Sequence, residues 1–169
     1  MNESDALWPA ARVDREGRPY TVRPYQDADL AELRAMYLDF EPKRVAQGLP
    51  PSDEAGLDRW LASVLPHGTH LVVHVEGRLA GHVMLLPMDG DAAELANFLH
   101  QSVRSRGIGT ELNRIALEIA RRNGFRRVWL SVEPSNRAAV KSYRRAGFQP
   151  RPGSLWAREI EMEATTSVS

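Results

Sequence analysis

Two arginines and two glycines stand close together in the middle of the chain, in the stretch Arg104-Ser105-Arg106-Gly107-Ile108-Gly109. An aliphatic run precedes this stretch and an amphipathic run follows it, so it is predicted to join a strand directly to a helix. Gly107 and Gly109 carry no side chain that would hold a ligand away from the backbone. Free N–H groups at a helix start attract anions, and arginines add charge-assisted donors. The stretch therefore predicts a site for a phosphate or pyrophosphate.

The same residues also have a plain structural interpretation. A Gly-x-Gly before a helix is often only a tight turn, and two arginines are often a solvated face. Two other phosphate motifs do not fit, because no Gly-Lys-Ser/Thr follows and Leu112 occupies the third glycine position of a Rossmann fingerprint. Taken alone, the stretch supports anion binding and a simple turn about equally.

A second pattern further along the chain decides between these interpretations. Val128–Ala139 and Tyr143–Phe148 are typical of a strand that leads into a helix closed by Gly147. Together the two patterns resemble the GNAT N-acetyltransferases. The signature of that family is Arg/Gln-x-x-Gly-x-Gly/Ala, then a strand, an Asn near the next helix start, a Tyr seven residues on, and Gly-Phe. The matching positions are Arg104, Gly107, Gly109, Asn136, Tyr143, Gly147 and Phe148.

The resemblance implies acetyl-coenzyme A as co-substrate, with its pyrophosphate on the glycine turn. Phe98–His100 would lie along the pantetheine arm, in a strand that separates from the next strand near a bulge. A backbone N–H near Phe98 or Leu99 would polarise the thioester carbonyl, and Asn136 would contact the pantetheine side or fix the loop. The implied cofactor residues are Phe98, Leu99, His100, Arg104, Ser105, Arg106, Gly107, Ile108, Gly109, Thr110, Asn136, Ala139 and Tyr143.

Two residues are candidates for proton transfer when an amine attacks the thioester. Tyr143, which the resemblance places near the sulfur, suits a general acid because a phenol has a pKa near 10. Glu94 is the candidate general base, acting through a water, and Glu133 is a second candidate. The structural alternatives are that Glu94 is a solvated strand residue and that Tyr143 belongs to an ordinary amphipathic core.

The predicted elements form one mixed α/β domain over residues 19–163. Its central mixed, mostly antiparallel, twisted sheet has helices on both faces, in the order strand, two helices, three strands, helix, strand, helix, strand. Residues 1–18 are expected to form an irregular arm and 164–169 a disordered tail. Strands are predicted at 20–24, 70–76, 79–87, 92–100, 127–132 and 154–162. Helices are predicted to follow Asp27, to begin after Ser52 or Asp53, and to span 107–123 and 136–146.

Composition limits the partners and the compartment. Lys plus Arg equals Asp plus Glu at 22 each, so no net field favours nucleic acid or an anionic membrane. The absence of cysteine excludes disulfides and thiolate metal sites, and no metal is expected. No signal peptide or long apolar run is visible, which predicts a cytoplasmic protein. A homodimer through the last strand is a further expectation.

The sequence favours an N-acetyltransferase that moves an acetyl group directly from acetyl-CoA to a primary amine of a small molecule or a protein. The acidic helix ends around the segment 41–51 mildly favour a basic acceptor, with a solvated helix face as the alternative. A catalytically inactive acyl-CoA-binding or sensing module is a second hypothesis. A purely structural protein on the same fold is a third.

Overall fold

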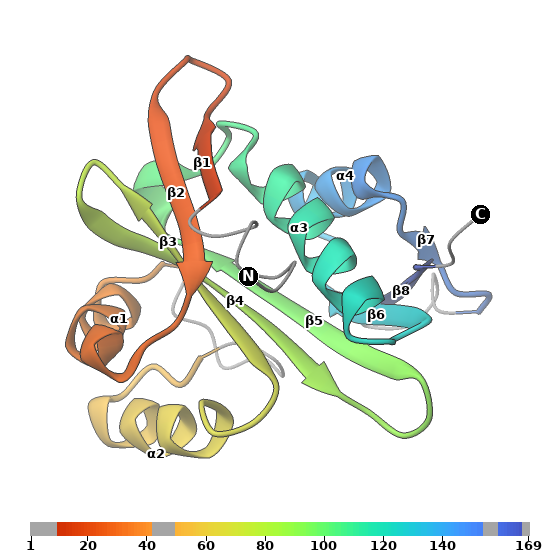
Figure 1. The fold of residues 1–169 in the computed structure, drawn as a ribbon, viewed down its shortest axis with the longest axis horizontal. Coiled ribbons are helices and arrows are strands. Elements are labelled where there is room, and N and C mark those ends of the chain that lie inside the picture. The colour runs from red at the N-terminus through yellow and green to blue at the C-terminus, as the bar shows by residue number, and fades with distance from the viewer. Residues whose placement is uncertain (1–9, 42–49, 154–158, 167–169) are drawn as a thin grey trace.

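A computed structural model describes residues 10–41, 50–153 and 159–166 of the chain. Its centre is an eight-stranded sheet in the order β1-β2-β3-β4-β5-β6-β8-β7 (Figure 1). All neighbouring strands are antiparallel except β5 and β6, which are parallel. The strands are β1 Ala10–Val13, β2 Pro19–Pro24, β3 Thr69–Val75, β4 Arg78–Pro87, β5 Ala92–Leu99, β6 Arg127–Val132, β7 Gln149–Pro150 and β8 Ile160–Thr165.

Helices cover both faces of this sheet, as predicted (Figure 1). The mixed, mostly antiparallel α/β architecture is therefore confirmed. Short 3-10 turns, η2 and η3, stand before α1 and before the glycine turn. The bounds are η2 Asp27–Asp29, α1 Leu30–Leu38, α2 Glu54–Val64, η3 Gln101–Val103, α3 Ile108–Arg122 and α4 Arg137–Ala146.

The larger core lies between the sheet and the helices α3 and α4. The apolar stripe of α3 faces the sheet, and its residues are at most 8% exposed because the 3.6-residue period brings them to one side. Phe148, directly after α4, is fully buried in the same core. The buried stripe of α3 is Ile108, Leu112, Ile115, Ala116 and Ile119.

A smaller core under α1 and α2 is rich in aromatic rings. Tyr37 on α1 makes edge-on contacts with Trp60 of α2 and Phe98 of β5, at centroid distances of 5.3 and 5.8 Å. Phe40 completes the group at 6.1 Å from Phe98. Edge-to-face pairs add stabilisation beyond the area they bury. The β5 side chains of this core, those of Ala96 and Phe98, therefore connect it to the strand that leads to the glycine turn.

A chain of three buried polar side chains runs through this smaller core. The Tyr37 hydroxyl lies 2.6 Å from His82 Nδ1, and His82 Nε2 lies 3.0 Å from His70 Nδ1. His70 Nε2 faces two carbonyl oxygens, those of Val64 and His67, at 2.9 and 2.6 Å. Since carbonyls only accept, His70 Nε2 carries a proton, His82 Nε2 donates to His70, and Tyr37 donates to His82. This series of hydrogen bonds fixes α1 and the end of α2 to strands β3 and β4.

Three predicted boundaries are wrong. Ala10–Val13 is not irregular, because β1 pairs with Pro19–Val22 of β2. The last strand does not stop at Met162 but continues to Thr165, so the expected disordered tail begins too early; Ala164 is only 4% exposed and Thr166 N donates to Arg126 O at 2.9 Å. The part of that predicted strand at 154–158 lies outside the described residues.

The start of the first helix and the position of the turn between β3 and β4 also differ from the prediction. Asp27 does not cap the first helix; η2 begins there, and the Asp29 carboxylate accepts from Gln26 N at 2.8 Å. The turn between β3 and β4 is Glu76-Gly77 rather than Gly77-Arg78, with φ of 52° and 76°. Two successive left-handed residues give the type I′ geometry that suits a two-residue hairpin.

We predict that the free energy of unfolding decreases as the pH is lowered, because of the histidine pair. Burial lowers the pKa of His82 from 6.5 to about 3, and burial also lowers the pKa of His70. Below pH 6.5 the unfolded chain therefore binds more protons than the folded chain, and the free energy of unfolding decreases as pH falls toward 3. One such proton gives a slope of up to about 1.4 kcal/mol per pH unit.

Urea unfolding between pH 6.5 and 5, followed by tryptophan fluorescence, measures this slope. His82→Gln should flatten it, whereas a substitution at the exposed His67, His67→Gln, should leave it unchanged. The same slope in the wild type and in His82→Gln would contradict the assignment.

Candidate active site

The glycine turn lies between η3 and α3, at the C-terminal end of β5. Ser105 and Gly107 both have left-handed backbone, with φ of 63° and 83°. Gly107 is the N-cap of α3, and no side chain of the described residues caps the helix there. The first N–H groups of a 15-residue helix thus remain available at its positive end.

Packing at this turn does not account for Gly109. A Cβ on Gly109 would meet Ser142 Oγ at 3.5 Å and Leu99 Cδ1 at 3.6 Å, which are ordinary contact distances. Packing within the described chain therefore does not demand a glycine at position 109. A glycine there keeps the backbone bare on the side where a ligand can approach the N–H groups.

The two arginines of the turn are engaged with the protein itself. Arg104 donates through Nε to Leu99 O at 3.0 Å, also bonds Glu41 O, and lies 5.0 Å over the Phe40 ring. Burial lowers the pKa of the Arg104 guanidinium below its ordinary value. Arg106 donates to Ser102 O at 3.0 Å. Phosphate binding by their side chains stays a prediction.

Strands β5 and β6 are paired over three residues only and then part; the region between their unpaired segments is called the slot below. The two strands pair only from Ala92–Glu94 to Arg127–Trp129. Beyond Glu94, no pairing with β6 is found for Leu95–Leu99 in the described chain, while Leu130–Val132 pairs with β8. The predicted separation of the strands is therefore present, but the predicted bulge is not, because β5 keeps a continuous register with β4 from Ala93 to Leu99.

The register also determines which peptide groups face the slot. Met88 N donates to Ala92 O at 2.9 Å, and His100 N donates to Ala80 O at 2.8 Å. Since antiparallel hydrogen bonding alternates along a strand, even-numbered residues of β5 direct their backbone groups to β4. The N–H of Phe98 therefore points away from the slot. Asn97 and Leu99 present their N–H groups to it.

Asn136 and Tyr143 occupy the two ends of α4. The Asn136 side chain caps this helix by accepting from Ala139 N at 3.2 Å, so it fixes the loop after β6. Tyr143 is half-buried beside the larger core, with its ring edge-on to Phe148 at 5.8 Å. Burial raises the pKa of Tyr143 to about 12. The phenol therefore keeps its proton at neutral pH, as a general acid requires.

Glu94 lies on the opposite face of the sheet. It is paired with Leu86 of β4 and Trp129 of β6, at the closed end of the slot, and shares its face with Ala96 and Phe98. Its side chain is half-buried, and this burial raises the pKa of the carboxyl. Tyr143 and Glu94 therefore reach the slot from different faces. Glu133, the other candidate base, accepts through its carbonyl from Asn136 N at 3.0 Å, in the loop that precedes α4.

Sequence reasoning missed a polar chain that joins the slot to both helices of the larger core. Asn97 Nδ2 donates to Asn113 Oδ1 at 3.0 Å, and Asn113 Nδ2 donates to Ser142 Oγ at 3.2 Å. Thr110 Oγ1 lies 3.1 Å from the same Ser142 oxygen. The available signal was Asn113 itself, a polar residue next to the apolar stripe of α3.

Comparison with known proteins is consistent with this geometry. The family model of the Acetyltransferase (GNAT) family matches residues 30–148. The chain belongs to this family. A Bacillus subtilis protein named for alanine N-acetylation of a ribosomal protein is 31% identical over 85 residues, which are 50% of this chain and 56% of the relative. The chain thus spans about half the length of the curated relatives that it matches.

Solved structures show the same fold at low sequence identity. The GNAT domain of S. lividans PAT has a TM-score of 0.80 and 22% identity, over 95% of this chain and 98% of that domain. A chimera of the Vibrio cholerae spermidine N-acetyltransferase SpeG and hSSAT has a TM-score of 0.70 and 18% identity, over 87% and 95% of the two chains.

No helix within the described ranges is both long and apolar enough to cross a membrane. In the same ranges, no group of three or more His, Cys, Asp or Glu side chains is placed to hold a metal ion.

The two glycines of the turn should differ in their effect on stability. Gly107→Ala forces a Cβ onto left-handed backbone and should lower the free energy of unfolding by about 1 kcal/mol or more. Gly109→Ala, inside the first turn of α3 and with room for its Cβ, should leave stability unchanged or slightly raised. Thermal unfolding of both variants is the measurement. Equal losses of stability would show that packing requires both glycines.

Proposed function

We propose that this chain transfers an acetyl group from acetyl-CoA directly to an amine, in the slot between β5 and β6. The observation that carries the proposal is the separation of β5 from β6 beside the uncapped start of α3. One end of the slot offers N–H groups for a diphosphate, and its edge offers peptide groups for an extended amide-bearing arm. Membership of a family that uses acetyl-CoA as co-substrate supports this assignment.

The cofactor residues are proposed in three groups. The diphosphate binds to the backbone from Arg104 to Thr110, the pantetheine arm follows Phe98–His100, and α4 closes the slot with Asn136, Ala139 and Tyr143. The thioester carbonyl lies near the free N–H of Leu99 or Asn97 rather than that of Phe98. A fixed backbone donor stabilises the oxyanion because it needs no reorganisation during the reaction.

The reaction needs one proton removed and one proton supplied. The neutral amine nitrogen attacks the thioester carbonyl carbon, and the C–S bond breaks as the tetrahedral intermediate collapses. Tyr143 donates its phenolic proton to the leaving thiolate, and Glu94 receives the proton of the attacking nitrogen through a water. The phenolate and the carboxylic acid then return to their starting states by proton exchange with solvent.

The acceptor enters from the face of α1 and α2. Trp129 stands beside Glu94 on this face, and a cavity of about 250 Å³ next to Trp129 is lined by residues of both charges, Asp89, Glu163, Arg127 and Arg151 among them. The face of Trp129 favours a cationic amine, whereas the mixed charges of the cavity do not select one. The names of the similar proteins include spermidine and ribosomal-protein alanine, so a small molecule and a protein amine are both acceptors to be tested.

A second candidate function is an acyl-CoA-binding module without catalysis. The engagement of Arg104 and Arg106 within the protein is compatible with it, because the turn would be structured with or without turnover. Release of coenzyme A with any amine would exclude this alternative.

Calorimetric titration with acetyl-CoA tests the cofactor site. The wild type should bind, and Gly109→Glu should not, because a carboxylate would occupy the place of a phosphate. Gly109→Ala is the matched control for folding, since it adds only a Cβ at the same position. Equal affinity of the wild type and Gly109→Glu would show that the turn is not the site.

Turnover of two variants tests the assigned proton transfers. Tyr143→Phe keeps the ring contact with Phe148 and should lower kcat by roughly 10²–10⁴-fold with little change in acetyl-CoA affinity. In the wild type, activity should be lost as pH falls through the raised pKa of Glu94, because the base is then protonated. Glu94→Gln should remove that acidic limb and lower the rate. Rates of both variants within a few-fold of wild type would make the two residues structural.

A further inference from the structure

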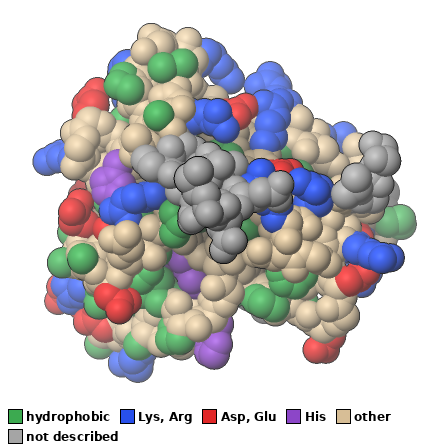
Figure 2. All heavy atoms as spheres, in the orientation of Figure 1, with side chains coloured by type: hydrophobic (Ala, Val, Ile, Leu, Met, Phe, Trp, Pro, Cys, Tyr) green, Lys and Arg blue, Asp and Glu red, His purple; other side chains and the backbone are tan. Residues whose placement is uncertain are grey.

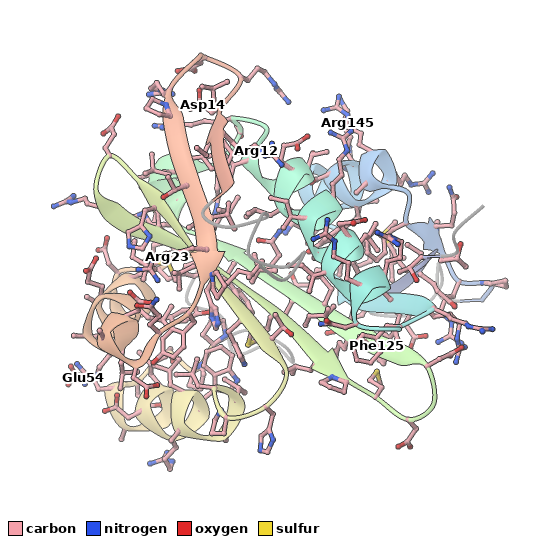
Figure 3. All side chains as sticks on the ribbon, viewed as in Figure 1. Arg12, Asp14, Arg23, Glu54, Phe125 and Arg145 are labelled. Atoms are coloured by element: carbon pink, nitrogen blue, oxygen red, sulfur yellow. The ribbon has the colours of Figure 1, made fainter. Side chains whose placement is uncertain are left out.

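The N-terminal hairpin of β1 and β2 lies against the glycine turn, far from it in sequence. Arg15 N, in the hairpin loop, donates to Arg106 O at 2.8 Å. The buried Asp14 carboxylate lies 3.7 Å from Arg106 Nη1. Figure 3 labels Asp14 on the hairpin and Arg145 on α4, on either side of the start of α3 in that view. The hairpin therefore forms one wall of the region where the diphosphate is proposed to bind.

The loop of this hairpin is held rigidly by Asp14. Its Oδ1 accepts from the backbone N–H groups of Glu16 and Arg18, both at 2.9 Å. Burial acts to raise the pKa of Asp14, but these N–H groups and the nearby guanidinium groups hold it below its usual value. Gly17 takes the left-handed conformation, with φ of 81°, that closes the loop. The backbone at Arg15 is thus fixed before any ligand binds.

The Arg15 side chain reaches the glycine turn and is exposed. Its Nε and Nη2 atoms lie 3.7 Å from the position that a Cβ on Gly107 would take. The other arginines around this turn have protein acceptors: Arg18 has Glu16, Arg104 has Leu99 O, and Arg106 has Ser102 O. For the Arg15 guanidinium, the described parts of the chain supply no hydrogen-bond acceptor and no carboxylate within ion-pair distance.

We infer that Arg15 binds a phosphate of the coenzyme A diphosphate together with the first N–H groups of α3. A guanidinium presents paired donors that match two phosphate oxygens, and the helix start supplies further donors to the same group. Basic side chains (blue) line the upper part of the face shown in Figure 2, where the hairpin and the start of α3 lie. Arg15 stands outside residues 30–148, the part that matches the family model, so this contact belongs to the chain's own N-terminal hairpin. The inference rests on the proposed function.

The experiment is calorimetric titration of Arg15→Ala and Arg15→Lys with acetyl-CoA and with its 3′-dephospho form. Arg15→Ala should raise the Kd for both ligands by about 10- to 100-fold, as expected for the loss of a charged hydrogen-bonded pair. Arg15→Lys should recover part of this loss, because it restores the charge without the paired donors. Arg12→Ala is the matched control, since it removes the same charge from the same hairpin at an exposed position on β1, and should change Kd less than threefold.

A kinetic readout separates binding from chemistry. With S-acetylpantetheine, which has no diphosphate, wild type and Arg15→Ala should have the same kcat/KM, and with saturating acetyl-CoA they should have the same kcat. Thermal unfolding of Arg15→Ala should match wild type, because its backbone bond to Arg106 remains.

Each contrary result has its own meaning. If wild type does not bind acetyl-CoA, the proposed function fails. If wild type binds and Arg15→Ala behaves like Arg12→Ala, the inference fails and the proposed function stands. A loss in Arg15→Ala that disappears with the 3′-dephospho ligand would assign Arg15 to the 3′-phosphate and overturn its placement on the diphosphate.

Discussion

Beyond Glu94, β5 runs on with one edge of its backbone facing a gap instead of a strand. Peptide groups at such an edge must find a partner or remain in contact with solvent, because a buried unpaired group costs free energy. At one end of this edge, Leu99 O has a partner, because Arg104 donates a hydrogen bond to it. Along the rest of the edge no strand pairs with β5 within the described residues, and in the proposed function a ligand with its own amides pairs there. The open edge is thus a cost to the folded chain, and the proposed function makes it the surface that binds acetyl-CoA.

Polar side chains connect the sheet to the helical layers on both of its faces. On one face, the chain from Asn97 through Asn113 to Ser142 connects β5 to α3 and α4. On the other face, hydrogen bonds connect α1 to β4 and β3. Tyr37 of α1 donates to His82 of β4, and His82 donates to His70 of β3. Both series are almost fully satisfied, and buried polar networks of this kind specify one arrangement of the core. Each of them crosses between layers, so neither layer can slide without breaking hydrogen bonds.

The sequence predicted the elements that have a clear hydrophobic periodicity. It missed the strands that form only by pairing with another segment of the chain. The stripe of α3, the helix that starts beside Asn136 and its end at Gly147 are local features, and all three are found. The strand β1 and the end of β8 were missed because their short segments become strands only by pairing with β2 and β6. Residues that act at a distance in sequence, such as Arg15, carry no local signal at all. The orientations of the Arg104 and Arg106 side chains could not be predicted either. They depend on the carbonyl oxygens that accept from them, Glu41 O for Arg104 and Ser102 O for Arg106.

The charges of this molecule cancel in total, but they are unevenly distributed over its surface. The formal net charge is zero, which gives no attraction toward a polyanion at long range. At the start of α3, however, the Arg15 guanidinium lies beside the positive end of the helix. On the α1 and α2 face, Glu94, Trp129 and Glu163 lie side by side across three strands, and Arg127 and Arg151 line the same cavity as Trp129 and Glu163. Since the field of a local group outweighs a cancelled net charge within one Debye length, the start of α3 would attract an anionic donor. The charges around Trp129 are mixed, so charge alone does not select the acceptor.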